Sequence, residues 1–147
     1  MLIIKPYIFQ KYPEIIFGFS TKIINSNNSA FGFNLSLSVG DDKSIVESNR
    51  SLFFNAIGLD KNSIAFQKQT HSDIINIVYS SGNKGESDAL ITNKKNLGLA
   101  ITVADCTPIF IYDHKNKVIA GVHSGWRGTE KKILLKTALM TGICFYL

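Results

Sequence analysis

Apolar residues recur at helical spacing after a pair of aspartates near residue 41 and predict the clearest helix in the chain. Ser44 and Glu47 have the spacing of a capping box, so we expect the helix to begin at that point. Gly58, which follows the last apolar position, is a residue that commonly ends helices. A second helix is predicted to begin near Gly128 and to carry the apolar residues up to Leu139.

Short runs of apolar and β-branched residues predict strands over most of the remaining chain. These runs are 14–20, 34–40, 64–67, 74–79, 97–103, 108–112 and 118–122. A polar tip around His114 separates the last two runs, so we expect a hairpin with an exposed His114. The pattern predicts an α/β (α+β) fold, a mixed sheet with flanking helices, in a single domain over residues 1–147.

The residues from Met140 to Leu147 form a mainly apolar tail that has no charged residue at its end. Such a tail predicts apolar surface that is left uncovered, and we therefore expect the fold to be incomplete at its C-terminus. Cys144 in this tail is expected to be an incidental thiol.

Composition and charge restrict the classes of function. The chain has 147 residues and 45% apolar content, enough to bury a core. The net charge is +5, but the basic residues occur singly and in short pairs, which favours a solvated surface without a nucleic-acid partner. No apolar stretch approaches the roughly 20 residues of a membrane span, so we expect no membrane partner. Two cysteines make no disulfide framework, which favours a cytoplasmic protein with reduced thiols.

Three residues with metal-binding side chains lie at the ends of predicted strands. His71 precedes one strand, whereas Cys106 and His123 each follow another. Two imidazoles and one thiolate suit Zn²⁺ and leave a fourth position open for water or substrate. The wide spacings form no compact chelate motif, so the pattern also fits two half-buried histidines and a small buried cysteine.

Seven short strings occur in a fixed order along the chain. They are Gly18-Phe-Ser-Thr21, Asn34-Leu-Ser-Leu-Ser-Val-Gly-Asp-Asp42, Glu47-Ser-Asn-Arg50, Gln69-Thr-His71, Ser87-Asp-Ala-Leu90, Ala104-Asp-Cys106-Thr-Pro108 and His123-Ser-Gly-Trp-Arg-Gly-Thr129. Together they closely resemble the laccase-domain (YfiH-like) family, and the last two strings are specific when found together. In that family two His and one Cys bind the metal, which implies His71, Cys106 and His123 as the ligands here.

Members of this family were formerly called multicopper polyphenol oxidases and are now described as purine nucleoside phosphorylases with adenosine deaminase activity. The resemblance implies a zinc-dependent enzyme, both transferase and hydrolase, with a purine nucleoside and inorganic phosphate as its partners. It would phosphorolyse adenosine, inosine, guanosine and methylthioadenosine, and deaminate adenosine. Deamination needs an activated water, which a zinc with an open position supplies.

Further residues are expected to act at this site. Cys106 and Asp105 are the expected catalytic residues, and Asp105 either orients a ligand His, acts as a general base or is a turn residue. Arg127 is expected to bind phosphate through its forked guanidinium, or else to stack on Trp126. Asp88 is interpreted as a turn residue.

Three more residues are expected to bind substrate or phosphate. Asn34 either lines the pocket or serves its own loop. Gln69 either bonds the purine edge or supports His71. Lys22 stands where the family usually has an arginine, and it keeps the positive charge without the bidentate fork.

Two rival hypotheses remain open. One is a copper-dependent polyphenol oxidase, which is disfavoured because a multicopper site needs about ten clustered His and this chain has three. The other is an inactive, truncated metal-binding remnant, because family members are considerably longer and continue beyond the second helix. The sequence leaves the oligomeric state open.

Overall fold

The computed structural model describes residues 2–22 and 31–142. The chain divides into two compact units, Met1–Lys61 and Asn62–Leu147. Both helices and strands are present in quantity, so the predicted α+β class is confirmed. A single domain over residues 1–147 stays a prediction. Cys144 and most of the apolar tail lie outside the described residues.

The first unit contains the predicted helix, α1 (Lys43–Ala56). The N-cap is Asp42, whose carboxylate accepts hydrogen bonds from the backbone N–H groups of Ser44 and Ile45, so the capping box predicted at Ser44 is wrong. A carboxylate directly before the helix reaches its free N–H groups better than the serine hydroxyl inside the first turn. Gly58 has a φ of 77° just beyond the helix, which confirms the predicted end.

The strands predicted before α1 are largely replaced by turns. The short antiparallel pair β1 (Ile3–Ile4) and β2 (Phe19–Ser20) and the 3-10 helix η1 (Tyr7–Lys11) precede α1. Residues 34–40 form no strand, because the Asn34 side chain makes two hydrogen bonds with the backbone of Ser36. Its amide oxygen accepts from the Ser36 N–H at 2.8 Å, and its amide nitrogen donates to the Ser36 carbonyl at 2.9 Å. An asparagine that bonds the backbone two residues on stabilises a turn in place of a ladder.

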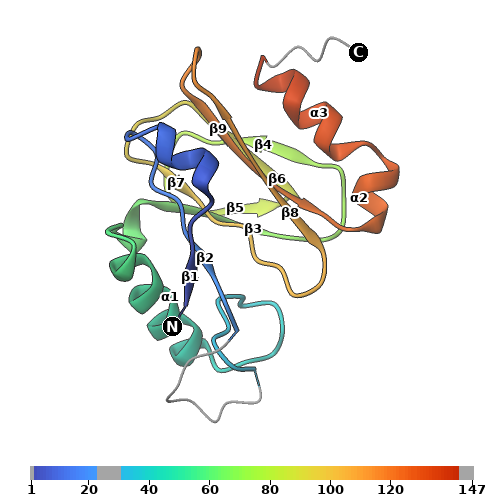
Figure 1. Cartoon of the computed structure of the whole chain (residues 1–147). Helices are drawn as coiled ribbons and strands as arrows, with labels where there is room; N and C mark the ends of the chain where they lie inside the picture. Colours follow the sequence, from blue (N-terminus) through green and yellow to red (C-terminus); the bar gives the residue numbers. More distant parts are fainter. Residues whose placement is uncertain (1, 23–30, 143–147) are drawn as a thin grey trace. The chain divides into compact units, whose positions relative to one another are not determined.

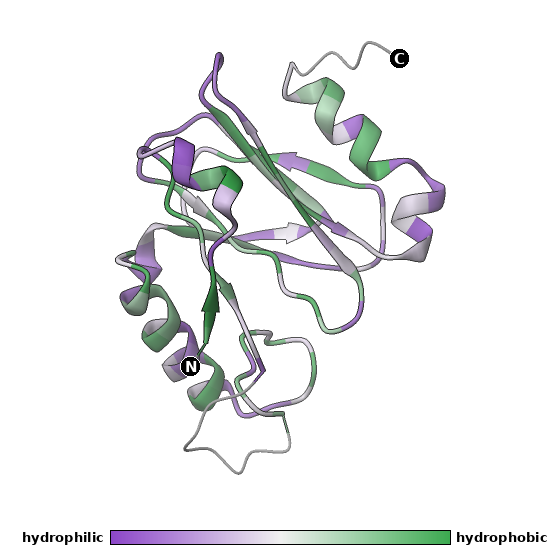
Figure 2. Ribbon diagram, in the orientation of Figure 1, coloured by the Kyte–Doolittle hydropathy of each residue, from purple (hydrophilic) through white to green (hydrophobic). Residues whose placement is uncertain are grey.

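The second unit contains two sheets, preceded by the 3-10 helix η2 (Lys61–Ser63). In one sheet the order is β5 (Gly82–Glu86), β3 (Ile64–Lys68), β7 (Gly98–Leu99), and all pairs are parallel. In the other, a mixed sheet, the order is β4 (Ile75–Ile77), β6 (Ala89–Thr92), β9 (Val118–Ser124), β8 (Thr107–Asp113). The predicted hairpin is confirmed as the antiparallel pair β8–β9, and its tip is hydrophilic (Figure 2).

Strand β6 is the centre of the second unit, and the sequence pattern did not predict it. Leu90 packs in a cluster with Ala65 of β3, whereas its neighbour Ala89 packs with Val122 and Ile133 on the opposite face. All four residues of β6 are buried. A strand covered on both faces lacks the alternation of apolar and polar residues that marks a half-exposed strand. The three apolar residues of β6 are also too few to form a clear strand signal.

The predicted second helix is two helices, α2 (Trp126–Glu130) and α3 (Ile133–Met140). Lys132 between them has a left-handed φ of 61°, which interrupts the helical hydrogen bonds. Ile133 of α3 is fully buried against the mixed sheet, so α3 covers one face of that sheet (Figure 1).

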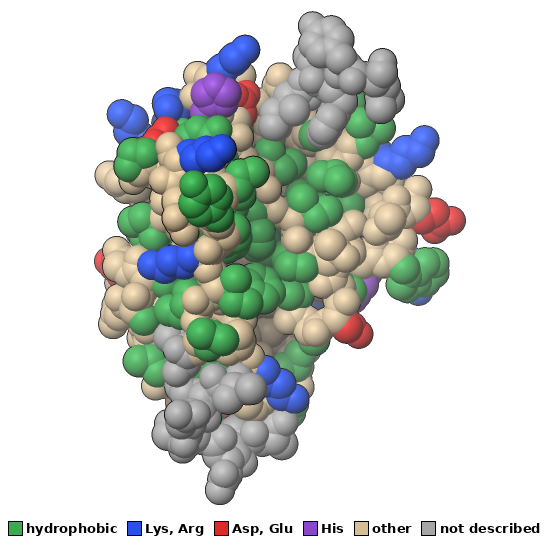
Figure 3. Space-filling model, viewed as in Figure 1, with side chains coloured by type: hydrophobic (Ala, Val, Ile, Leu, Met, Phe, Trp, Pro, Cys, Tyr) green, Lys and Arg blue, Asp and Glu red, His purple; other side chains and the backbone are tan. Residues whose placement is uncertain are grey.

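The charged surface agrees with the dispersed basic residues of the sequence. On the face drawn in Figure 3, the Lys and Arg side chains are spread out and form no continuous patch. In the described part of the chain, no helix has the length and apolar character that crossing a membrane requires.

Candidate metal centre

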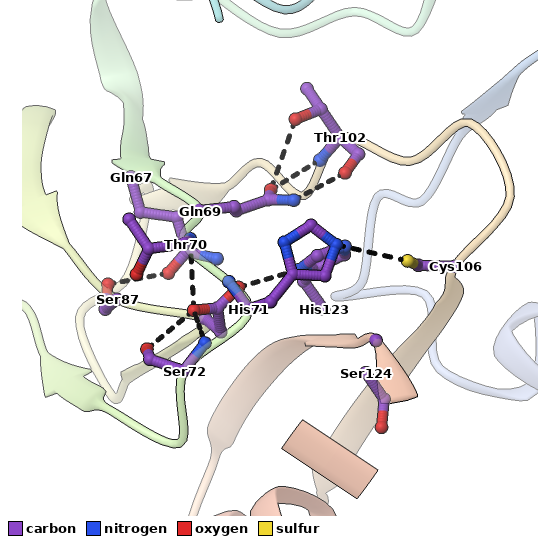
Figure 4. A network of polar contacts seen from close by, with 12 residues as sticks. Gln67, Gln69, Thr70, His71, Ser72, Ser87, Thr102, Cys106, His123 and Ser124 are labelled. Carbon is purple, nitrogen blue, oxygen red and sulfur yellow. Dashed lines mark hydrogen bonds and ion pairs between the residues drawn. The ribbon is translucent and has the colours of Figure 1, made fainter. Parts of the chain in front are cut away.

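The structure brings the three predicted ligands together. His71 lies in the turn after β3, Cys106 directly precedes β8, and His123 lies near the end of β9. Their donor atoms all lie within 4.8 Å of one another. Figure 4 shows the His71 imidazole directed at Cys106, with 3.6 Å between Nε2 and Sγ. Among the described residues this is the group of His, Cys and acidic side chains that could hold a metal ion.

The donor set fits zinc in its chemistry, and the separation between Cys106 and His71 also fits. In a tetrahedral zinc site, the usual ligand distances place a Cys sulfur and a His nitrogen about 3.6 Å apart. The observed separation of 3.6 Å between Cys106 Sγ and His71 Nε2 equals this tetrahedral edge. Three ligands leave a fourth coordination position for water or substrate. Two imidazoles and a thiolate also occur around copper, so the donor set by itself does not identify the metal.

The sheet places His123 beside Asp88. The backbone N–H of His123 donates to the carbonyl of Asp88 at 2.7 Å, next to the paired residues Ala89 and Val122. Nδ1 of the His123 ring also lies 2.7 Å from Oδ1 of the Asp88 carboxylate, and both side chains are buried. A carboxylate can only accept, so Nδ1 carries the proton and Nε2 is the nitrogen that can bind a metal.

The Asp88 carboxylate also holds the turn that carries His71. It accepts from the backbone N–H groups of Thr70, His71 and Ser72 at 3.2, 3.1 and 2.6 Å, and from the Ser72 hydroxyl at 2.6 Å. Burial alone raises the pKa of Asp88, but the hydrogen bonds from His123, Ser72 and Thr70 outweigh it and lower the pKa to about 2. The sequence favours a turn residue over a site residue at Asp88, whereas its carboxylate contacts both expected ligand histidines; a role at the site stays a prediction.

His71 is held in an unusual conformation. Its φ is 58°, in the left-handed region that non-glycine residues seldom adopt. Gly125 leaves room for its ring, because a Cβ at that position would lie 2.5 Å from His71 Cδ2 and 3.4 Å from Cys106 Sγ. Gly125 thus allows the close approach of the ring. Gly125 and Asp88 both lie in strings that carry the family resemblance, but neither was expected to act at the site.

The thiol of Cys106 lies in negative surroundings. Burial raises its pKa above the ordinary value, and the charge of Asp105, a hydrogen bond with Asp105 and the charge of Asp88 raise it further. A bound cation would oppose all of these effects and favour the thiolate. Asp105 is exposed and lies beside Cys106, whereas the carboxylate that orients His123 is Asp88. A catalytic role for Asp105 stays a prediction.

Arg127 and Gln69 both have partners within the second unit. The Arg127 guanidinium lies 5.1 Å from the centre of the exposed Trp126 ring, which is the stacking alternative expected from the sequence. The side-chain amide of Gln69 donates a hydrogen bond to the Thr102 carbonyl at 2.6 Å and accepts one from the Thr102 backbone N–H at 2.9 Å. This pairing anchors the chain just before His71. Binding of phosphate by Arg127 and of a purine edge by Gln69 stay predictions.

Asn34 and Lys22 belong to the first unit. The Asn34 amide donates to Ser36 and to the Asp41 carboxylate, so it serves its own turn. Lys22 has an exposed side chain, and its carbonyl accepts from the N–H of Phe33. Their expected roles in binding substrate or phosphate stay predictions.

Residues 16–142 match the family model described as multi-copper polyphenol oxidoreductase laccase. The chain belongs to this family. The family resemblance inferred from the sequence strings is thereby confirmed.

Curated and solved relatives agree with this assignment. A purine nucleoside phosphorylase of Corynebacterium glutamicum is 36% identical over 124 residues, which cover 81% of this chain and 50% of the relative. The purine nucleoside phosphorylase YlmD of Bacillus subtilis is 33% identical over 135 residues, with 84% and 49% covered. The crystal structure of the Bacillus licheniformis hypothetical protein YfiH superposes with a TM-score of 0.76 at 29% identity and covers 84% of this chain and 50% of that one. The chain therefore spans about half the length of these relatives.

Proposed function

We propose that this chain carries the zinc site of a purine nucleoside enzyme that phosphorolyses purine nucleosides and deaminates adenosine. The observation that supports it most is the convergence of His71, Cys106 and His123, with their donor atoms within 4.8 Å of one another. Two relatives that share about a third of its residues over most of this chain are named purine nucleoside phosphorylases.

The chain's own residues would hold the metal and the substrate in defined roles. Nε2 of His123, Nε2 of His71 and Sγ of Cys106 would be the ligands. A bound zinc would lower the pKa of a water molecule and so provide the nucleophile that replaces the amino group of adenosine, which leaves as ammonia. Asp105, the exposed neighbour of Cys106, would take up or return a proton.

In phosphorolysis, a phosphate oxygen forms a bond to C1′ of the ribose while the bond from C1′ to the purine nitrogen breaks. Arg127 is the residue of the second unit proposed to bind this phosphate. Its stacking on Trp126 would hold the planar guanidinium ready to donate two parallel hydrogen bonds. Substrate binding by Gln69 belongs to the same proposal, and binding of substrate or phosphate by Asn34 and Lys22 of the first unit stays a prediction of the family resemblance.

Zinc is proposed in preference to copper because phosphorolysis and deamination involve no electron transfer. The family description names copper, and a His₂Cys set can bind it. A single group of three ligands in the described residues, however, offers one metal position and not the several that a multicopper oxidase needs.

The test is metal analysis of purified, untagged protein, wild type beside Cys106→Ala, with adenosine and phosphate turnover measured on the same samples. We expect about one zinc per chain in the wild type and a loss of zinc in Cys106→Ala. Adenine with ribose 1-phosphate would show phosphorolysis, and inosine with ammonia would show deamination. Cys144→Ala is the matched control, since it removes the other cysteine of the sequence.

Each result bears on a different part of the proposal. Zinc that stays bound in Cys106→Ala would refute the ligand set. Stoichiometric copper with oxidation of a phenol would favour the polyphenol oxidase. Stoichiometric zinc without turnover would favour the inactive remnant.

A further inference from the structure

The carboxylate of Asp88 joins the two histidines of the candidate site through a single oxygen atom. Oδ1 lies 2.7 Å from Nδ1 of the His123 ring and 3.1 Å from the backbone nitrogen of His71. The two histidines come from elements far apart in sequence, the turn after β3 and the strand β9. One buried atom therefore sets the position of both.

The second oxygen of Asp88 holds the rest of the turn. Oδ2 accepts from the backbone N–H and the hydroxyl of Ser72, both at 2.6 Å, and from the N–H of Thr70 at 3.2 Å. Asp88 has no exposed surface, so its carboxylate relies on these protein donors. Hydrogen bonds to an ionised acceptor are stronger than those between neutral groups, and here several act on one short turn.

We infer that Asp88 is a positioning residue that forms the metal site before any metal binds. This role of Asp88 rests on the proposed metal site, although it does not depend on which reaction the site performs. Asp88 fixes the tautomer of His123 with the proton on Nδ1, which leaves Nε2 free to coordinate. It also holds His71 in its left-handed conformation, with φ at 58°, so that the ring is directed at Cys106 (Figure 4).

The first test uses metal-free wild-type protein and needs no turnover. Nitrogen-15 NMR of the imidazole rings should show His123 as the tautomer with the proton on Nδ1. Hydrogen exchange should show the amides of His71 and Ser72 as protected, because both donate to Asp88. A His123 protonated on Nε2 alone, or an unprotected pair of amides, would overturn the inference.

The second test measures zinc affinity by competition with a chromophoric chelator. Asp88→Asn should weaken zinc binding by about 10- to 100-fold, the range found when a partner of a metal-bound histidine is removed. Cobalt(II) bound to this variant should keep its thiolate absorption from Cys106, while the bands that report coordination geometry shift. Asp73→Asn is the matched control, since Asp73 lies in the same segment but pairs with Lys131 and Lys136. Its zinc affinity should stay within about twofold of wild type.

Wild-type zinc affinity in Asp88→Asn would refute the inference. If that variant does not fold, Ser72→Ala removes the hydroxyl donor and leaves the contact with His123 intact. It should accelerate exchange of the amides of residues 70–72, and unchanged exchange would count against the inference. Zinc binding without turnover would defeat the proposed function and leave the role of Asp88 standing.

Discussion

His123 lies inside the β6–β9–β8 ladder, with 4% of its side chain exposed and its backbone N–H bonded to Asp88. His71 lies in an exposed turn after β3, outside any regular element, with a left-handed φ of 58°. Both rings nevertheless meet, with centroids 4.8 Å apart. The same candidate site is thus built from a rigid strand and from a turn that has no ladder to support it.

The difference shows two ways of placing a ligand. The backbone of His123 is placed by cross-strand hydrogen bonds, and the core beneath β9 supports it. The backbone of His71 is held by one carboxylate, and its ring fits in the space that Gly125 leaves. Changes to the core should therefore act on His123 through stability, whereas crowding of the His71 ring should act mainly on the metal site.

Removal of core support under β9 has the largest expected effect. Ile133→Ala should lower the free energy of unfolding by about 2–5 kcal/mol, because Ile133 is fully buried against Ala89 and Val122. Chemical denaturation measures the change. The neighbouring, partly exposed Leu134 is the control, and Leu134→Ala should change stability far less. Equal losses in the two variants would contradict this description of the core.

Crowding of the turn should affect the metal site and spare the fold. In Gly125→Ala the new methyl group would meet the His71 ring, so we expect zinc affinity to fall roughly tenfold, or about 1.4 kcal/mol. Chelator competition and a thermal melt on the same samples measure both quantities. Ser124→Ala is the control, since the Ser124 side chain points away from the imidazoles (Figure 4). Unchanged zinc affinity in Gly125→Ala would show that the turn can move freely.

Acid should weaken the contacts of Asp88 with His71 and His123 together, because both histidines bond to this one carboxylate. The pKa of Asp88 is lowered to about 2 from an ordinary value of 3.8. Its ionised form therefore stabilises the fold above pH 3.8, and this contribution is lost as the pH falls toward about 2. Urea melts between pH 5 and pH 2 should show this loss in the wild type and a weaker dependence in Asp88→Asn. An identical pH dependence in both would assign the acid sensitivity to other groups.

The smallest effect is expected at the ion pairs of Asp73 with Lys131, which follows α2, and with Lys136 of α3. Asp73 lies 2.6 Å from Lys136 and 3.4 Å from Lys131, and the lysines are about half exposed. Asp73→Asn should lower Tm by about 2 °C or less, because exposed ion pairs contribute little. The difference should vanish in high salt. A large loss of stability would show that the ion pairs, as well as Asp88, hold the turn.

Local patterns predicted well those elements whose signals are local. Gly58 ends α1 as expected, and the polar tip around His114 separates β8 from β9. Patterns failed where a side-chain hydrogen bond or burial on both faces overrides the alternation. The run at 34–40 alternates like a strand but is bent by the Asn34 side chain, and β6 is too short and too buried to alternate.

The sequence by itself determined which side chains could bind a metal and which family the chain resembles, because both depend on residue identity and order. Only the tertiary structure decided that Asp88 is the partner of His123 and that Gly125 makes room for His71. The pairing of β6 with β9 and the approach of the first turn of α2 to the turn at His71 bring together residues far apart in the chain. Spacing along a sequence carries no record of such contacts, since they arise from sheet register and close packing.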